Sequence, residues 1–205
     1  MRGSWMRGAL ALGLVAALVP LGAVGAGGGA RCKGEPVTIA ATGGDDVING
    51  TPGPDVINGR GGDDVIRGRG GRDRICGGSG EDSLFGGRGR DFLFGMGGAD
   101  LLRGGPKKDL VNGGPGNDFL YGGPGPDDMF GLGGNDVIRG QGGADFIFGD
   151  FGADELYGND GNDCITTADG TSGNDLGNGG PGFDTSTSDP GDTLLNFEQE
   201  FVCGD

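Results

Sequence analysis

The 205-residue sequence contains no histidine, and its 15 lysine and arginine residues are outnumbered by 30 aspartate and glutamate residues. Without histidine, neither a Ser-His-Asp nor a Cys-His catalytic set can be assembled. The formal net charge of −15 disfavours binding to nucleic acid. A GxxxxGK[ST] phosphate loop is also missing, and the GxGxxG of Gly177, Gly179 and Gly182 lies outside any strand–helix context. We therefore expect neither an enzyme nor a nucleic-acid partner.

Long hydrophobic runs are missing too, except at the N-terminus. Arg2 and Arg7 precede an apolar run from Gly8 to Val19, and small residues follow the run. This order predicts a secretory signal peptide over residues 1–26, and the shortness of the run argues against a membrane anchor. After cleavage behind Ala26 we expect a soluble, secreted protein with no membrane span, in an extracellular setting where calcium is abundant.

Glycine is what the sequence has in excess, with 54 residues, and it recurs in a fixed pattern. Fourteen consecutive nonapeptides of the form Gly-Gly-x-Gly-x-Asp-x-aliphatic-x run without interruption from Ala41 to Thr166. Collagen is excluded because the seventh place of the repeat is never glycine, and low-complexity disorder would not keep the aspartate and aliphatic columns in phase. The sixth place is aspartate in every unit: Asp46, Asp55, Asp64, Asp73, Asp82, Asp91, Asp100, Asp109, Asp118, Asp127, Asp136, Asp145, Asp154 and Asp163.

Each unit has the parts of one half-turn of a solenoid. Its first six residues are typical of a turn, and its last three form a minimal strand with one inward aliphatic residue. Units two apart would then lie side by side as parallel strands about 4.8 Å apart. Burying one aliphatic residue per unit contributes about 2–3 kcal/mol, whereas ordering nine residues costs on the order of 10 kcal/mol. The core alone is therefore too small to hold this fold, and we expect a ligand to stabilise it.

The aspartate column indicates what that ligand is. Stacked turns bring carboxylates within a strand spacing or two, where they repel one another. A hard divalent cation between turns converts this repulsion into attraction, and carboxylate plus backbone carbonyl oxygens suit Ca²⁺ better than Mg²⁺. We therefore predict multiple bound Ca²⁺ ions, with the fourteen sixth-place aspartates as metal ligands. Acidic pairs such as Asp45-Asp46 are interpreted as ligands and turn residues, not as a catalytic pair.

The runs Gly77–Phe85 and Gly113–Tyr121 resemble the repeat of the RTX, or hemolysin-type calcium-binding, family. The resemblance covers residues 41–166. It implies an all-β fold, a right-handed parallel β-roll solenoid of nonapeptide repeats with short non-repeat caps. It further implies Ca²⁺ sites formed by the sixth-place aspartates of units n and n+2 and by backbone carbonyls. RTX arrays are often appended to lipases or proteases, but too few residues remain here for a catalytic domain.

The ends of the array are expected to be caps. Residues 27–40 form the N-terminal cap, in which Ile39 takes the eighth place of a preceding unit. Residues 167–205 form a degenerate repeat and a C-terminal cap, with apolar residues between Leu194 and Val202 as a lid. The four cysteines suggest disulfides in an exported chain. Their connectivity cannot be derived, although proximity along the coil favours Cys32–Cys76 and Cys164–Cys203.

Unit eight departs from the repeat, because Lys107 replaces the fourth-place glycine and Lys108 follows it. Two positive charges beside a cation site should weaken it, so we expect the poorest calcium occupancy at Asp109. Alternatively, the backbone folds as in the other units and the lysines point to water.

Outward aromatic residues leave two interpretations open. Even-numbered units carry Phe92, Phe94, Phe130, Phe146 and Phe148; odd-numbered units carry Arg67, Arg103 and Arg139 with Phe85, Phe119, Tyr121 and Tyr157. The aromatic rings either stack across strands and stiffen the sheet, or are covered by a partner, such as the tail from Leu194 to Val202 or a second copy.

The sequence thus leaves two candidate functions. The first is a secreted calcium-binding protein whose roll folds on binding Ca²⁺. The second is a calcium-dependent adhesion or recognition module that displays the aromatic face.

Overall fold

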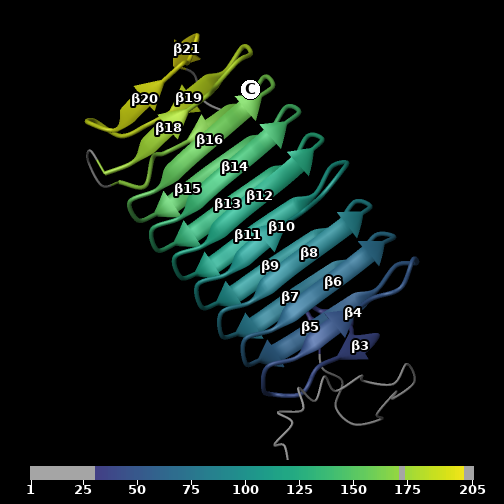
Figure 1. Ribbon diagram of the computed structural model, residues 1–205. Coiled ribbons are helices and arrows are strands. Elements are labelled where there is room, and N and C mark those ends of the chain that lie inside the picture. Colours follow the sequence, from purple (N-terminus) through teal and green to yellow (C-terminus); the bar gives the residue numbers. More distant parts are fainter. Residues whose placement is uncertain (1–30, 171–173, 201–205) are drawn as a thin grey trace, which may run out of the picture.

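The computed structural model describes residues 31–170 and 174–200, which form a parallel β-solenoid without any helix in this described part. Two sheets make the walls of the coil (Figure 1). The nine-stranded sheet contains β4 (Val47–Asn49), β6 (Val65–Gly70), β8 (Ser83–Arg88), β10 (Leu101–Arg103), β12 (Phe119–Pro124), β14 (Val137–Gly142), β16 (Glu155–Asp160), β18 (Leu176–Asn178) and β20 (Thr193–Leu195). The ten-stranded sheet contains β3 (Ile39–Ala40), β5 (Val56–Gly61), β7 (Arg74–Ser79), β9 (Phe92–Gly97), β11 (Leu110–Pro115), β13 (Asp128–Gly133), β15 (Phe146–Phe151), β17 (Cys164–Thr166), β19 (Thr185–Thr187) and β21 (Gln199–Glu200).

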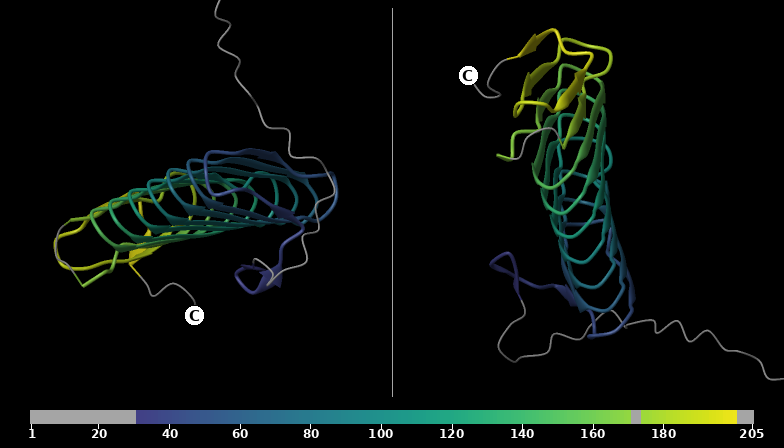
Figure 2. Two further views of the ribbon diagram at one scale, coloured as in Figure 1. Left: turned by 90° about the horizontal axis from the view of Figure 1, so that it is seen from below. Right: turned by 90° about the vertical axis from the view of Figure 1, so that its left-hand side faces the viewer.

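The register confirms that each nonapeptide makes half a turn. Ile57 pairs with Ile75 in the ten-stranded sheet, and Leu102 pairs with Leu120 in the nine-stranded sheet. Each partner lies two units further along the chain, and consecutive strands alternate between the sheets. The views in Figure 2 show the resulting turns stacked along one axis. The expected all-β parallel roll of nonapeptide repeats is therefore the observed architecture.

The core is a single layer of eighth-place side chains contributed by both sheets. From Ile57 to Ile165 each of them is 0 % exposed, and Ile48 at the first turn is 5 % exposed. The buried set comprises Ile48, Ile57, Ile66, Ile75, Leu84, Leu93, Leu102, Val111, Leu120, Met129, Ile138, Ile147, Leu156 and Ile165. Most strands have six residues and not the expected three, but their next inward position is a glycine, as in β5 and β9, so each strand still contributes one inward aliphatic side chain. The core is thus continuous but thin.

Glycine is needed in the turns because neighbouring turns approach closely. A Cβ at fourth-place Gly80, which has φ 124°, would lie 2.2 Å from the carbonyl oxygen of Gly62 in the turn before it. The second place is less restricted, since Arg60 and Met96 adopt φ values of 76° and 84° there. These values fall in or near the left-handed region, which non-glycine residues enter at some cost. Stacking of the turns therefore depends on the fourth-place glycine more than on the second.

The N-terminal cap combines a core strand with a hairpin. Ile39 of β3 pairs with Ile57 and packs against the core, as expected for a preceding unit. The hairpin of β1 (Arg31–Cys32) and β2 (Glu35–Pro36) precedes it. The structure contains the favoured disulfide between Cys32 and Cys76, whose Cα atoms are 5.7 Å apart. This bond attaches the hairpin to β7, where Cys76 is 1 % exposed.

At the other end the roll continues beyond the regular array. Gly177 of β18 pairs with Leu156, and Ser186 of β19 pairs with Ile165, so the eighth place persists with smaller residues. Phe197 packs against the core there. The possibility that the tail covers the aromatic face is wrong for its described part, because β20 and β21 extend the sheets at their edges. Phe201, Val202 and Cys203 lie outside the described residues, so the Cys164–Cys203 pairing stays a prediction.

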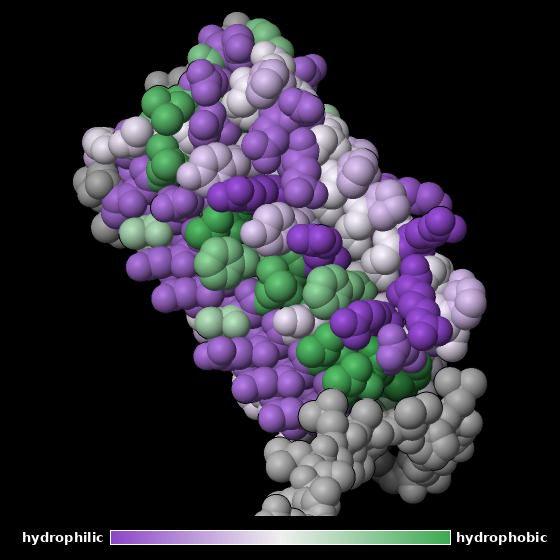
Figure 3. Space-filling model, in the orientation of Figure 1, coloured by the Kyte–Doolittle hydropathy of each residue, from purple (hydrophilic) through white to green (hydrophobic). Residues whose placement is uncertain are grey.

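The outward aromatic residues make contacts within their own sheets. In the ten-stranded sheet the rings of Phe130 and Phe148 stack with centroids 5.3 Å apart, and Phe146 stacks on Phe148 at 5.8 Å. In the nine-stranded sheet the guanidinium of Arg139 lies 4.9 Å from the ring of Tyr157 in the next turn. Arg67 over Phe85 and Arg103 over Tyr121 repeat this arrangement. Figure 3 shows apolar and strongly hydrophilic side chains side by side along the roll.

Candidate calcium sites

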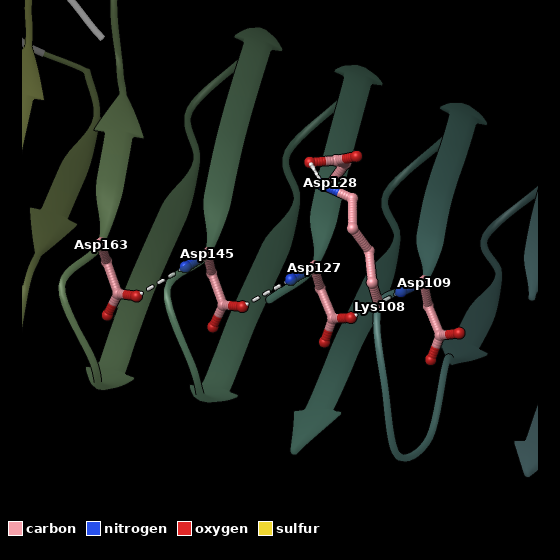
Figure 4. Close-up of polar contacts among 6 residues, drawn as sticks. All are labelled: Lys108, Asp109, Asp127, Asp128, Asp145 and Asp163. Atoms are coloured by element: carbon pink, nitrogen blue, oxygen red, sulfur yellow. Dashed lines mark hydrogen bonds and ion pairs between the residues drawn. The ribbon is translucent and has the colours of Figure 1, made fainter. Parts of the chain in front are cut away.

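The structure arranges the sixth-place aspartates in two hydrogen-bonded ladders, one along each edge of the roll. In every step, a backbone N–H donates to Oδ1 of the aspartate one turn further on, at 2.7–2.9 Å. Figure 4 shows one stretch, in which Asp109, Asp127, Asp145 and Asp163 follow one another. All fourteen of the predicted aspartates belong to these ladders, and none is more than 8 % exposed. The structure thus brings each of them next to its counterpart two units away.

The second oxygen of these carboxylates has a different environment. Within the described part of the chain, Oδ2 is buried and has no hydrogen-bond partner in Asp64, Asp73, Asp82, Asp91, Asp100, Asp109, Asp118, Asp127, Asp136, Asp145, Asp154 and Asp163. A buried carboxylate oxygen without a partner is costly. Its repetition at the same place in consecutive turns is not a local accident of packing. It marks a row of positions where a cation would supply the missing interaction.

Backbone carbonyl oxygens lie beside these unpartnered atoms. A Cβ placed on first-place Gly77 would be 2.3 Å from Oδ2 of Asp82 and 2.9 Å from the carbonyl oxygen of Gly95 in the next turn. The same pair of contacts recurs at Gly113, which faces Asp118 Oδ2 and the carbonyl oxygen of Gly131. The first-place glycine thus keeps a carboxylate and a carbonyl oxygen close together. An oxygen-only donor set of this kind fits Ca²⁺.

Side chains alone do not complete such a site. Among the described residues, no group of three or more His, Cys, Asp or Glu side chains is placed to hold a metal ion. Each aspartate meets its neighbours along the ladder only through the Oδ1 hydrogen bond to their backbone. A cation bound here would therefore need ligands besides these side chains, and the turn carbonyls beside Oδ2 could supply them.

Burial and mutual repulsion shift these carboxyl groups. Desolvation raises the pKa of Asp127 to about 8, against the lowering effect of the hydrogen bond from Asp109, and the Asp109 and Asp145 charges add to the rise. Desolvation likewise raises the pKa of Asp118 and Asp163 to about 7. Without a counter-charge, the ladder therefore holds protons near neutral pH. The aspartates repel one another as the sequence predicts, but loss of hydration is the larger cause.

The first two units differ from the others. Oδ2 of Asp46 accepts hydrogen bonds from the backbone N–H and the hydroxyl of Thr42, at 2.8 and 2.7 Å. Thr51 does the same for Asp55, at 2.6 and 3.0 Å. These two carboxylates thus have local partners that the other twelve lack. Threonine at the second place, visible in the sequence, is the signal that separates them.

The ladders also extend beyond the predicted set. Asp154 N–H donates to Oδ1 of Asp175, and Asp163 N–H donates to Oδ1 of Asp184, both at 2.8 Å. Both added aspartates have a buried, unpartnered Oδ2. Glu198 ends one ladder, because its Oε2 accepts from Asp184 N–H at 2.7 Å. In the sequence, the glycine-rich run from Gly179 to Asp184 indicates a turn with Asp184 at the sixth place. Asp175 is harder to recognise, because it follows Asp163 by twelve residues instead of nine.

Unit eight keeps the ladder despite its lysines. Asp109 Oδ1 accepts from Asp91 N–H at 2.7 Å, as in the other units. Lys107 adopts φ 91° at the fourth place and is exposed, and its charge lowers the pKa of Asp91 against the dominant effect of burial. Lys108 turns outward and forms an ion pair with Asp128 at 2.8 Å (Figure 4). The ladder therefore persists here, although β10 has three residues where its neighbours β8 and β12 have six, and weak occupancy at Asp109 stays a prediction.

Comparison with known families agrees with this geometry. The family model of the RTX calcium-binding nonapeptide repeat, which spans four copies, matches residues 41–75, 77–106, 94–129, 103–138 and 130–165. Together these matches cover the array from its first unit to its last. No curated protein matches the chain. In the described residues there is no helix long and apolar enough to span a membrane.

Proposed function

The chain belongs to the RTX calcium-binding nonapeptide repeat family, and on that premise we propose that it is a secreted protein whose roll folds when Ca²⁺ binds between stacked turns. The sixth-place aspartates from Asp64 to Asp163, with Asp175 and Asp184, would hold the ions together with carbonyl oxygens of the glycine-rich turns. Asp46 and Asp55 would contribute less, because threonine already engages them.

The observation that carries this proposal is the row of buried Oδ2 atoms without partners. Bound calcium would place positive charge beside oxygens that are buried away from water and are repelled by the carboxylate of the next turn. In the folded roll the Oδ1 hydrogen bonds hold each carboxylate in place, so that Oδ2 faces the proposed position of the ion. The protein's own contribution is thus a set of oriented oxygen atoms, repeated at every turn.

Coupling of binding to folding follows from the size of the core. One eighth-place residue per unit is buried, which is too little to offset the ordering of a glycine-rich chain. A ligand that binds only the folded state adds its binding free energy to folding. We therefore expect the chain to be largely unfolded at low calcium and folded outside the cell, where calcium is abundant. The proposed signal peptide, residues 1–26, would deliver it there.

The aromatic face does not require a second function. Its rings stack on one another or lie under arginine side chains in neighbouring turns. Such contacts stabilise a sheet by themselves. We therefore rank calcium-dependent folding above adhesion.

Isothermal titration calorimetry of the chain from residue 27 to 205 tests the proposal. We expect several Ca²⁺ ions to bind and Mg²⁺ to bind much more weakly. The double variant Asp109→Asn and Asp127→Asn keeps the Oδ1 acceptors but removes two charges, and it should bind fewer ions. Asp45→Asn is the matched control, because Asp45 is exposed and Asn117 makes the same backbone contact elsewhere. Equal stoichiometry in all three proteins, or no calcium uptake at all, would contradict the proposal.

A further inference from the structure

The residues at the fifth place of the repeat are basic along one long edge of the roll and acidic along the other, over three turns each. Turns 68–73, 86–91 and 104–109 lead from the nine-stranded to the ten-stranded sheet and carry Arg72, Arg90 and Lys108 at this place. Turns 41–46, 59–64 and 77–82 lead back at the opposite edge and carry Asp45, Asp63 and Glu81. We call these rows the basic rim and the acidic rim. At the fifth place each row has three charges of one sign in three consecutive turns, while the exposed Arg60 at the second place of turn 59–64 is the one opposite charge at the acidic edge.

The basic rim is compact and exposed. Gly71 N–H donates to the carbonyl oxygen of Arg88 at 2.9 Å, so its turns are directly stacked, about 4.8 Å apart. Arg72 and Arg90 are exposed, and Lys108 is half-buried. Further exposed charges at Arg69, Arg88 and Lys107 lie in the same turns. The acidic residues of these turns are the buried sixth-place aspartates alone.

The acidic rim is held in place by its own ladder. Asp63 N–H donates to Oδ1 of Asp45 at 2.9 Å, and Glu81 N–H donates to Oδ1 of Asp63 at 2.8 Å. All three side chains are exposed. The hydrogen bonds fix the direction of two of the carboxylates and leave one oxygen of each available. The row is therefore oriented in advance for cations that arrive at the same spacing.

Each row is unfavourable within a single molecule, because like charges repel at one strand spacing. Alternating the signs along each edge would have removed this cost. Intramolecular ion pairing offsets this repulsion only at Lys108, whose pair with Asp128 is the sole one between described residues. Arg72 lies 4.9 Å from the ring of Phe92, and this contact leaves its charge without a carboxylate partner. The next turns are neutral at the fifth place, with Pro126 and Ala144 after the basic rim and Ala99 and Asn117 after the acidic rim. The rows thus match in length, in spacing and in opposite sign.

We propose that the basic rim of one molecule docks along the acidic rim of a second copy of this chain, with the two roll axes parallel. Arg72 would meet Asp45, Arg90 would meet Asp63, and Lys108 would meet Glu81. In each pair the basic residue lies three units further along the repeat than its acidic partner. Neighbouring molecules would therefore be staggered by one and a half turns, or about 7 Å along the axis.

The geometry also sets the kind of assembly. The two rims lie on opposite edges of the same molecule, so the contact is heterologous: of two docked copies, one keeps a free acidic rim and the other a free basic rim. Such contacts generate open rows, not closed dimers. Exposed ion pairs are individually weak and are screened by salt. The assembly should therefore form at high protein concentration and low ionic strength, and it rests on the proposed function because only the folded roll has rims.

Sedimentation velocity of the chain from residue 27 to 205, in millimolar calcium at low and high salt, tests this inference. Wild-type protein should form larger species at low salt and revert to monomer at high salt. The variant Arg72→Glu, Arg90→Glu, Lys108→Glu should stay monomeric, as should the variant Asp45→Lys, Asp63→Lys, Glu81→Lys. A mixture of the two variants should associate again, because one has two acidic rims and the other two basic rims. Arg67→Glu, Arg103→Glu, Arg139→Glu is the control, since it makes the same charge change on a sheet face.

Circular dichroism on the same samples separates the two proposals. A wild-type chain that shows full β signal in calcium but stays monomeric at low salt would overturn the docking inference alone. The same holds if association survives either rim variant, or if the folded mixture fails to associate. Retention of a monomer on sulfated dextran through its basic rim would assign that rim to a polyanion instead. A chain without β signal in calcium would overturn the proposed function and this inference with it.

Discussion

The backbone N–H of Asp109 donates a 2.7 Å hydrogen bond to Oδ1 of Asp127, one turn further along the roll. This contact does two things at once. It links adjacent turns through the side chain of the repeat's invariant residue, and it turns Oδ2 of Asp127 toward a buried position without a partner. The ladder is therefore both part of the scaffold and the reason that the scaffold needs a cation.

The first prediction concerns that residue. Asp127→Asn keeps an Oδ1 acceptor for Asp109 N–H but removes one ligand charge, so the calcium midpoint for folding should rise several-fold. Asp127→Ala also removes the hydrogen bond and leaves the buried Asp109 N–H unpaired. It should therefore lower the stability of the folded, calcium-bound chain further, by about 1–3 kcal/mol. Calcium titrations followed by circular dichroism measure both effects. Equal behaviour of the Asn, Ala and wild-type chains would contradict the role assigned to the ladder.

The second prediction concerns pH without metal. The ordinary pKa of an aspartate is 3.8, and burial raises it to about 6 in Asp64 and about 8 in Asp127. The folded state therefore binds more protons than the unfolded state between about pH 4 and pH 8. In chelator, folding should be favoured as the pH falls toward 5 and disfavoured as it rises toward 8. With calcium present the trend should reverse, because protons compete with the ions.

Circular dichroism across this pH range, with and without chelator, measures that reversal. A metal-free chain whose β signal grows as the pH rises from 5 to 8 would contradict the assigned shifts.

The third prediction separates two glycines. Gly113→Ala places a Cβ 2.3 Å from Oδ2 of Asp118 and 3.0 Å from the carbonyl oxygen of Gly131, at the proposed site. Gly133→Ala is the matched control, because no atom lies within 4 Å of its Cβ. We expect the first substitution to weaken calcium binding and lower the melting temperature in calcium, and the second to change neither much. The idea of a glycine-lined site fails if both variants melt together with the wild type.

The fourth prediction concerns unit eight. Lys107→Gly restores the fourth-place glycine and removes a positive charge that acts on Asp91. It should relieve the strained φ of 91° and tighten calcium binding to the neighbouring turns. Calorimetry should show a higher affinity or one more ion bound. An unchanged titration would indicate that Lys107 simply points to water.

The fifth prediction concerns the N-terminal cap. Replacing Cys32 and Cys76 by serine frees the hairpin from β7 and opens a link that spans 44 residues. Disulfides that close loops of this order contribute about 2–4 kcal/mol. The variant should need more calcium to fold and should lose protection first near β5 and β7 in hydrogen exchange. Loss of protection confined to the C-terminal turns would contradict this assignment.

The repeat predicted most of the architecture, because a few fixed places in each nonapeptide determine it. Asp at the sixth place and an aliphatic residue at the eighth specify the turn, the strand and the half-turn step, and Ile57 pairs with Ile75 as the period requires. The sequence also predicted that Ile39 takes the eighth place of a preceding unit, and it favoured the Cys32–Cys76 disulfide. These features follow from the nine-residue period or from closeness along the coil, so the spacing of residues in the sequence is enough to predict them.

Other features depend on contacts that spacing does not reveal. The sequence could not show that Oδ1 is occupied by a backbone N–H while Oδ2 is not, since that distinction needs coordinates. The insertion before Asp175 obscured the continuation of the ladder, because an irregular loop can rejoin the coil in register. The tail extends both sheets, since strand edges at the end of a solenoid remain available for pairing.

The most direct test of the account is far-UV circular dichroism of the chain from residue 27 to 205 at neutral pH, during a titration from excess chelator to millimolar calcium. The account predicts a largely disordered spectrum in chelator and a cooperative gain of β signal as calcium is added, with little response to magnesium. The same β spectrum in chelator and in calcium, together with no metal uptake in equilibrium dialysis, would contradict it.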